Sequence, residues 1–367
     1  MKTTTALAAS ASILAMMTTT PGMAQSMDDL IAGARAEGML TTIALPHDWC
    51  GYGAVIDGFR QMYPFLEINE LNPDAGSADE LEAIRANRDN TGPQAPDVID
   101  VGLAFGPTAA AEGLITPYMV STWDTIPEGA RDAEGYWYGD YYGVMSFIVN
   151  TDLVENVPTS FADLLKPEYV GQVALAGDPR ASNQAILAVM AAGMAQGAEP
   201  GAAAAEAGLE YFAQLNASGN FVPVIGRTGT LAQGTTPILI QWDYNALAAR
   251  DTLAGNPPVE VIVPSDAVLA GVYVQGISAF APHPNAARLW MEYLYSDAGQ
   301  LGWLAGYCHP IRFNDLAARG VIPQDMMDAL PPAESYAAAV FPTLDQVNAN
   351  RDAVVANWDA VVGANVN

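Results

Sequence analysis

Short apolar runs alternate along the chain with segments in which apolar residues recur every three or four positions. The runs have the length and composition of buried strands, and the spacing of the other segments is typical of amphipathic helices. Strands are expected at 39–45, 66–71, 98–101, 144–150, 173–176, 237–241, 259–263 and 271–280. Helices are expected at 55–62, from Ser182 onward, on both sides of Pro200-Gly201, and over 285–295. This alternation predicts an α/β fold with largely parallel sheets.

A polar pair at 77–80 refines the start of one predicted helix. Ser77 and Glu80 have the spacing of a capping box, in which each side chain hydrogen-bonds the backbone of the first helical turn. Leu81 and Ile84 then supply the buried face of that helix. We therefore assign Glu80 to helix capping at this point.

The first residues have the pattern of a secretory signal peptide. Lys2 precedes a short apolar stretch over 6–17, and small residues stand before a cleavage position after Ala24. A buried core helix is the alternative, and no later segment contains the roughly 18 apolar residues that span a bilayer. We expect an exported protein that is free in the periplasm.

Charge narrows the choice of partners. The 367 residues include 41 acidic and 14 basic side chains, which gives a net charge of −27. Phosphate recognition requires a basic face, so we expect neither nucleic-acid binding nor insertion into an anionic membrane. The hydrophobic fraction of 51% is that of a folded protein, and the length suggests two packed units.

The two cysteines, Cys50 and Cys308, would reside in an oxidising compartment after export. A bond between them would close a very long loop and stabilise the fold by up to about 5 kcal/mol. Two buried free thiols are the alternative, because cysteine also serves as a small hydrophobic residue.

Several ordered blocks resemble the extracellular solute-binding proteins of ABC importers, in the family that takes up iron, polyamines, phosphonates and similar solutes. The blocks are Tyr136-Trp137-Tyr138-Gly139, Val149-Asn150-Thr151-Asp152-Leu153, the segment 158–169 with Gly171, Gly177-Asp178-Pro179, His283-Pro284-Asn285-Ala286-Ala287, Tyr293-Leu294-Tyr295-Ser296-Asp297 and Gly299-Gln300.

The resemblance implies a two-lobe clamshell with two hinge crossings, one near Asn150 and one near 271–273. Residues 25–150 and 272–367 would form the first lobe, including the C-terminal helices, and 151–271 the second. Such a protein captures a solute in the cleft and docks on an inner-membrane ABC permease. We expect a monomer without a cofactor.

The first candidate binding segment follows the first predicted strand. Asp48, Trp49 and Tyr52 combine a carboxylate with two aromatic faces, which suits an alkylammonium group through ion pairing and cation–π contact. A loop that packs its own tryptophan is the alternative. The segment has no recognised metal-ligand spacing.

The second candidate segment contains Trp242 and Asp243, where a strand leads into a helix. Asp243 would face an amine or cap the helix, and Trp242 would form a wall or belong to the core. Iron-binding relatives carry two adjacent tyrosines in this neighbourhood, whereas this chain has only Tyr244. That difference favours an organic cation or zwitterion, and a ferric-iron receptor remains the alternative.

The third candidate segment lies at a predicted helix start. Arg180, Ser182 and Asn183 would bind an anion together with the free backbone N–H groups of the first turn, or simply cap the helix. If the second and third segments both bind, the solute carries an amine and an acid. An aminophosphonate or amino acid fits that pattern better than a polyamine.

Two tyrosines complete the candidate set. Tyr141 belongs to an aromatic block that serves either as core or as cleft wall, and Tyr273 lies on the return crossing that faces the cleft in the resembling fold.

Enzyme motifs are absent from the sequence. It contains neither a Gly-x-Ser-x-Gly elbow, nor a phosphate-binding Gly-Lys-Ser loop, nor His-Glu-x-x-His, and it has three histidines. We therefore expect a periplasmic binding protein for a small polar solute, with an enzyme on the same fold as the alternative from another class.

Overall fold

The structure, a computed structural model, describes residues 26–330 and 336–367. The predicted signal peptide therefore lies outside the described residues. Within them, no helix is both long and apolar enough to cross a membrane.

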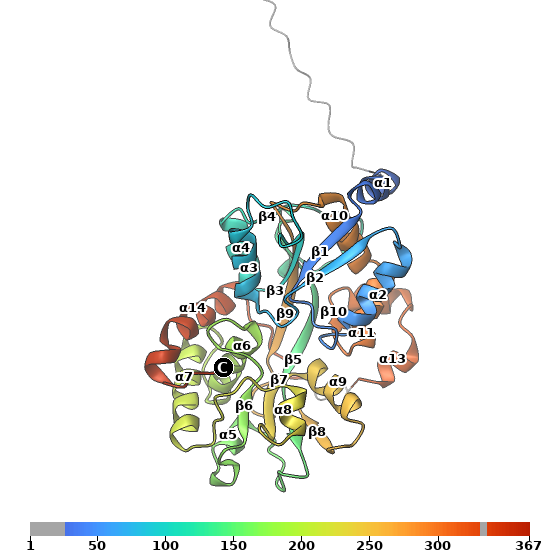
Figure 1. Cartoon of the computed structure of the whole chain (residues 1–367). Coiled ribbons are helices and arrows are strands. Elements are labelled where there is room, and N and C mark those ends of the chain that lie inside the picture. The colour runs from blue at the N-terminus through green and yellow to red at the C-terminus, as the bar shows by residue number, and fades with distance from the viewer. Residues whose placement is uncertain (1–25, 331–335) are drawn as a thin grey trace, which may run out of the picture.

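The chain forms two lobes, drawn above and below each other in Figure 1. The upper lobe contains the parallel pair β1–β2 and the strands β3 and β4, surrounded by helices. Its elements are α1 (Met27–Glu37), β1 (Met39–Ile43), α2 (Tyr52–Met62), β2 (Glu67–Leu71), α3 (Ser77–Ala86), β3 (Val98–Gly102), α4 (Phe105–Ala111), β4 (Ile115–Thr116), α10 (Pro284–Leu294), α11 (Asp297–Ala305), β10 (His309–Pro310), α12 (Phe313–Arg319) and α13 (Gln324–Asp328).

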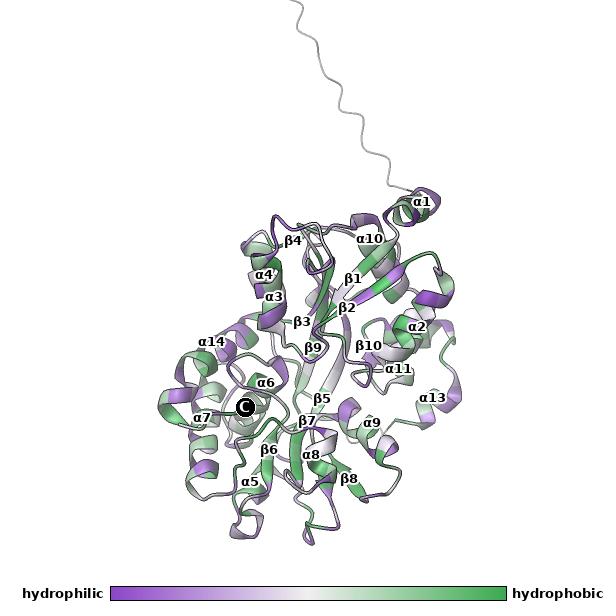
Figure 2. Ribbon diagram, in the orientation of Figure 1, coloured by the Kyte–Doolittle hydropathy of each residue, from purple (hydrophilic) through white to green (hydrophobic). Residues whose placement is uncertain are grey.

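The lower lobe is built around the strands β6, β7 and β8. Its elements are α5 (Phe161–Leu164), β6 (Val173–Leu175), α6 (Asn183–Ala195), α7 (Ala202–Ala217), α8 (Thr228–Ala232), β7 (Ile238–Trp242), α9 (Asp243–Leu253), β8 (Val259–Ile262) and α14 (Leu344–Val361). In Figure 2 the central strands are mainly hydrophobic, whereas α13 and α14 at the periphery carry hydrophilic segments.

Two long antiparallel strands connect the lobes, β5 (Tyr138–Asn150) and β9 (Ala270–Ser278). The first part of β5 pairs with β9 as far as Val144, and the part from Met145 onward pairs with β7. The first crossing thus lies before the expected Asn150, and the return crossing begins at Ala270. Every residue of β5 except Tyr142 is buried, so the connection is part of the core.

The predicted α/β class is confirmed, but the expected predominance of parallel pairing is wrong. The pairs β1–β2 and β6–β7 are parallel, whereas β5 and β9 are antiparallel to each of their neighbours. The reason is that β5 and β9 traverse the molecule in opposite directions, and the strands of both lobes attach to them.

The helix α14 packs on the lower lobe, not on the first lobe as expected. It presents Val347, Val354 and Trp358 to α6 and α7, and the Trp358 ring lies 5.7 Å from that of Phe212. Between Val347 and Val354 on the same helix, the Arg351 guanidinium reaches α4 of the upper lobe and donates to Thr108 Oγ1 at 3.0 Å.

The Ala/Gly-rich segment forms α6 and α7, which pack closely against each other. A Cβ added at Gly193 would lie 1.9 Å from the carbonyl oxygen of Ala204, and one at Gly208 would lie 2.0 Å from that of Val189. Small residues at these positions allow the helix backbones to meet, as the composition of the segment suggests.

The structure joins Cys50 to Cys308 by a disulfide across 258 residues of sequence, with a Cα–Cα distance of 5.5 Å. The bond ties the loop after β1 to the segment before β10.

Replacing both cysteines by serine should therefore lower the free energy of unfolding by about 2–5 kcal/mol, because the unfolded chain regains the entropy of a very long loop. Urea denaturation of the oxidised protein and the double variant measures this difference, and Glu155→Gln, at an exposed position, is the control. Equal midpoints and slopes would contradict the expectation.

Candidate functional site

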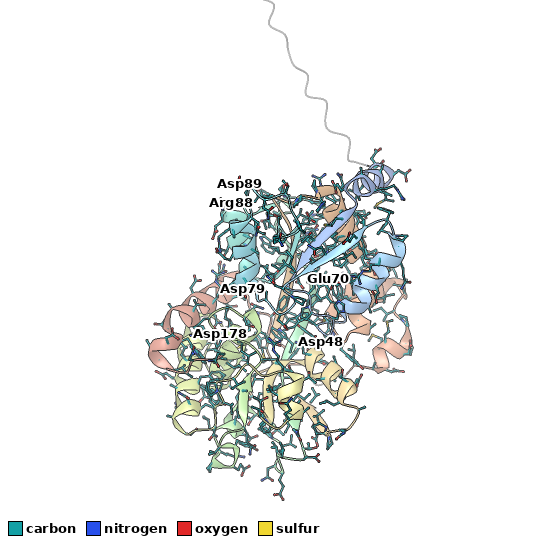
Figure 3. The ribbon with its side chains drawn as sticks, viewed as in Figure 1. Asp48, Glu70, Asp79, Arg88, Asp89 and Asp178 are labelled. Atoms are coloured by element: carbon teal, nitrogen blue, oxygen red, sulfur yellow. A yellow bond between two sulfur atoms is a disulfide. The ribbon has the colours of Figure 1, made fainter. Side chains whose placement is uncertain are left out.

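A cleft with a volume of about 530 Å³ lies between the two lobes. Its upper wall comes from the loop after β1, the start of α3, the middle of β3 and the start of β9. Its lower wall comes from the segment after β6, the start of α6, the segment 225–229 at the start of α8, and one side of α9 from Asn245 to Thr252. In Figure 3 the labelled Asp79 and Asp178 lie on opposite sides of the boundary between the lobes.

Half of the predicted site residues line this cleft. They are Asp48, Trp49, Ser182, Asn183 and Tyr273. The structure thus brings residues from the first candidate segment, the third candidate segment and the return crossing to one cavity, although more than 130 positions separate Trp49 from Asn183 in the sequence.

The loop that carries Trp49 is held from several sides. The disulfide of Cys50 fixes one end of it, and the indole Nε1 of Trp49 donates to the Tyr141 hydroxyl at 2.7 Å. The Trp49 ring also makes edge contacts with Tyr244 and Tyr273 at centroid distances of 5.4 and 5.5 Å. These contacts place one face of a rigid aromatic wall at the cleft.

Three predicted aromatic wall residues lie beneath the cleft surface instead. Tyr52, Tyr141 and Trp242 are fully buried, and none of them is among the lining residues. Each has a structural partner: the two tyrosine hydroxyls donate to Asp100, and Trp242 Nε1 donates to the Tyr273 hydroxyl at 3.4 Å. Their position in the sequence beside a carboxylate suggested contact with the solute, but Tyr52, Tyr141 and Trp242 are buried and pack behind the residues that line the cleft.

Asp243 does not face the cleft either. It is fully buried at the start of α9, where it accepts hydrogen bonds from the backbone N–H of Val144 and from the Tyr336 hydroxyl, both at 2.8 Å. Burial raises the pKa of Asp243 to about 6. The carboxyl group therefore fastens α9 to the crossing strand, and its expected contact with an amine is wrong.

Arg180 turns away from the cleft toward the C-terminal segment. Its guanidinium contacts Asp178 at 2.8 Å and donates to the side chain of Asn365 and the backbone oxygen of Val366. Because Asp178 neutralises it and the C-terminal segment occupies its donors, Arg180 is not available to an anion in the cleft.

Two functional candidates escaped the sequence analysis, Glu80 and Asp100, and both line the floor of the cleft. The helix α3 begins after Gly76, whose backbone N–H donates to Asp79, so the capping role expected of Glu80 belongs to Asp79. Glu80 accepts the backbone N–H of Asp100 at 2.9 Å. A charged residue in the middle of the apolar strand 98–102 was the signal that could have identified Asp100.

Asp100 is the best-connected polar group of the cleft floor. Its Oδ2 accepts the hydroxyls of Tyr52 at 2.6 Å and Tyr141 at 2.7 Å, whereas its Oδ1 has no hydrogen-bond partner among the described residues. Burial raises the pKa of Asp100 to about 7, against the two tyrosine hydrogen bonds, which lower it. Burial also raises the pKa of Glu80 well above its ordinary value, and the charge of Asp100 adds to that effect.

The lower wall combines uncharged polar residues with two charged ones, Asp178 and Arg227, each of which is paired with an opposite charge. Its centre is the start of α6, where Ser182 is the N-cap but makes no side-chain capping bond. The Gln184 side chain donates to the backbone oxygen of Ala176 and accepts from the backbone N–H of Trp242. The Asn183 side chain packs so closely on Gly102 that a Cβ at this glycine would lie 2.0 Å from Asn183 Cγ. Ser182, Asn183 and Gln184 at the beginning of this 13-residue helix line the cleft, so the positive end of the helix dipole lies at this wall and favours negative charge.

One ion pair bridges the mouth of the cleft. Arg227 of the lower lobe donates to Asp74 of the upper lobe at 2.8 Å, and both side chains are largely exposed. Such a pair contributes at most about 1 kcal/mol, so it favours the approach of the lobes only slightly.

The described residues contain no group of three or more His, Cys, Asp or Glu side chains placed to hold a metal ion.

Two lobes, two crossing strands and a polar cleft between them define the architecture of a two-lobe periplasmic binding protein. Residues 94–350 match the family model described as bacterial extracellular solute-binding protein, and the chain belongs to this family. The family implies a small-molecule ligand and an ABC permease as partner.

Solved structures share this fold at low sequence identity. The periplasmic binding protein P5PA is 19% identical with a TM-score of 0.69, covering 89% of this chain and 99% of that one. AfuA from Actinobacillus pleuropneumoniae with fructose-6-phosphate bound is 18% identical with a TM-score of 0.66, covering 88% and 98%. Iron-bound HitA from Pseudomonas aeruginosa is 16% identical with a TM-score of 0.63, covering 86% and 97%.

The raised pKa of Asp100 predicts a pH effect on the stability of the ligand-free protein. The folded state holds the proton up to about pH 7, whereas the unfolded state releases it near the ordinary value of 3.8. The contribution of Asp100 to the free energy of unfolding is therefore highest at acid pH and falls as the pH rises from about 4 to 7.

Asp100→Asn, which cannot ionise, should gain stability relative to the wild type between pH 5 and pH 8. Denaturant unfolding of both proteins at the two pH values measures this change, and Glu82→Gln on the exposed face of α3 is the control. A difference between wild type and Asp100→Asn that is the same at both pH values would show that Asp100 does not titrate in this range.

Proposed function

We propose that this protein is the substrate-binding component of an ABC importer and captures a small solute that carries a primary or secondary ammonium group, with an acidic group at its other end. The observation that supports the proposal is the unpartnered Oδ1 of Asp100 at the floor of the cleft, beside the carboxyl group of Glu80.

The upper wall supplies what an ammonium group requires. Carboxyl groups of Asp100 and Glu80 accept N–H donors, Asp48 adds negative charge at the rim, and the rings of Trp49 and Tyr273 offer a π face. Charge-assisted hydrogen bonds of this kind are about twice as strong as neutral ones.

The lower wall suits an acidic group. The start of α6 at Ser182 and Asn183 brings the positive end of the helix dipole to the cleft, and Thr228 and Asn245 add polar side chains along the same wall. A solute that spans the cleft would thus place its amine above and its acid below. This arrangement favours an amino acid or aminophosphonate over a polyamine, which would offer a second cation to the helix start.

The mechanism follows from the two crossings. We propose that the lobes rotate at two positions. One is Val144–Met145, where β5 changes its pairing partner, and the other is Ala270, where β9 begins. The solute contacts both walls, so it stabilises the closed arrangement, which then docks on the permease. We expect reversible binding without chemical conversion of the solute.

The decisive experiment is native mass spectrometry of protein taken from the periplasm without refolding. An added mass of a small organic molecule that is lost on denaturation would support the proposal, and its fragmentation would reveal the amine and the acid. A single bound iron would overturn the proposal in favour of a ferric-iron receptor. Conversion of the released solute by the protein would indicate an enzyme.

Asp100→Asn should weaken the binding of an amine solute at least tenfold, because the variant loses a charge-assisted hydrogen bond of about 1.5–3 kcal/mol. Titration calorimetry with the identified solute measures the change. Glu82→Gln, on the same side of the cleft but on the exposed face of α3, should retain the affinity of the wild type. Unchanged affinity of Asp100→Asn would contradict the assignment of the upper wall.

Methylation of the solute amine tests the upper wall by a change in the solute instead of in the protein. The cleft is lined by two aromatic rings, those of Trp49 and Tyr273, which are too few to form an aromatic cage around a methylated ammonium group. The carboxyl groups, in contrast, bind an ammonium group through its N–H donors. A trimethylammonium analogue of the solute should bind at least tenfold more weakly than the primary amine. If the two bind equally in competition titrations, cation–π contact would be the main source of affinity.

A further inference from the structure

Three carboxyl groups gather without a counter-charge at the floor of the cleft, where Glu80 and Asp100 line it, and just below it, where Asp140 lies. Glu80, Asp100 and Asp140 are 1%, 6% and 0% exposed. In the part of the chain that the structure describes, no arginine, lysine or histidine forms an ion pair with any of them. This arrangement is unusual, because a buried charge without a partner costs several kcal/mol.

Hydrogen bonds connect the three groups into one cluster. Glu80 accepts the backbone N–H of Asp100, and the Tyr52 hydroxyl that donates to Asp100 also accepts from Gln275 Nε2 at 2.9 Å. The same Nε2 donates to Asp140 at 2.8 Å. Each carboxyl group therefore feels the ionisation of the others.

The remaining groups around the cluster add no positive charge. The titratable groups that act on the cluster are acids and phenols, namely Tyr52 on α2, Asp79 and Glu80 on α3, Asp140 and Tyr141 on β5, Tyr244 on α9, Tyr273 on β9 and Tyr295 after α10. His309 on β10, which pairs with β5, stacks on Tyr142, and burial lowers the pKa of its imidazole to about 4, so it is neutral at the pH values considered. Hydroxyl and amide dipoles alone are left to stabilise ionised carboxyl groups in this space.

Three negative charges at such a site are too costly while the cleft is empty, so the cluster must retain protons. The direction of the pKa values agrees, since burial raises the pKa of all three groups and that of Asp100 to about 7. Asp140 does not line the cleft, whereas Asp100 and Glu80 do. A cation from the cleft can therefore reach the protons of these two groups only.

We propose that solute capture is an exchange of cations: the ammonium group of the solute replaces a proton that the Asp100–Glu80 pair holds in the empty cleft. The neutral carboxylic acid becomes a carboxylate, its proton leaves to solvent, and the ammonium group takes its place with all of its own protons. The net charge of the cluster and its occupant stays constant. This inference rests on the proposed function, and it adds regulation of the site by pH.

The exchange has a direct thermodynamic consequence. Below about pH 7, where Asp100 is protonated in the empty cleft, the apparent affinity should fall by up to about tenfold per pH unit, and above that pH it should level off. The solute would thus be held at neutral pH and released by acid.

The test counts protons during binding. Putrescine and β-alanine are the probes, because their amines and acid titrate well outside the range from about pH 5.5 to 8. Calorimetric titration at pH 6 in two buffers with different ionisation enthalpies gives the number of protons released. We expect about one proton per bound probe in the wild type, fewer at pH 8, and a smaller number with a flattened pH dependence in Asp100→Asn, which removes one of the two groups of the pair.

Glu82→Gln serves as the control and should match the wild type in both affinity and proton count. Infrared spectra of the ligand-free protein provide a second measurement, because a protonated carboxyl group has a carbonyl band separate from that of a carboxylate. Part of this band should be present at pH 6, be missing in Asp100→Asn, and decrease when the probe is added.

The outcomes separate the two proposals. A probe that binds with no proton release and with an affinity constant from pH 5.5 to 8 would overturn the exchange and leave the amine-binding function intact. Absence of the Asp100-dependent infrared band at pH 6 would overturn the exchange as well. If neither probe nor any other amine binds at any pH, the proposed function fails, and the exchange fails with it.

Discussion

The hydrogen bonding of β5 to both lobes is the constraint on which the rest of the structure depends. A single buried strand pairs with β9 in its first part and with β7 in its second, so both lobes are registered against one continuous strand. The same strand carries Asp140 and Tyr141 beneath the cleft and offers the Val144 N–H to Asp243. The connection between the lobes and the support of the binding floor are therefore one piece of backbone.

The elements and the architecture were predictable because they depend on patterns that are local or repeated. The apolar runs around 39–45, 98–101 and 173–176 became strands, and Pro200-Gly201 separates two helices as expected. The position of α14 was not predictable in this way. Its buried face is compatible with any apolar surface, and the sequence alone does not say that the small residues of α6 and α7 form the surface it meets.

The site was predictable only in part, for a different reason. Segments were located correctly by their position after strands, which is why Asp48, Trp49, Ser182 and Asn183 reach the cleft. The burial of each side chain was not predicted, because it depends on packing between segments that are distant in sequence. Tyr52, Tyr141 and Trp242 have the right chemistry for a wall, yet they form the layer behind it. Glu80 has the spacing of a cap and faces the cleft instead.

The anchoring of Trp49 has a spectroscopic consequence. Trp290 and Trp358 are fully enclosed in the core, where they pack on Phe59 and Phe212, and their surroundings change little when the cleft fills. Trp49 lines the cleft, and its indole N–H is held by a tyrosine that also bonds to Asp100. The environment of this indole is thus coupled to the charge of the floor, so the protein contains its own fluorescent reporter of occupancy and needs no added dye.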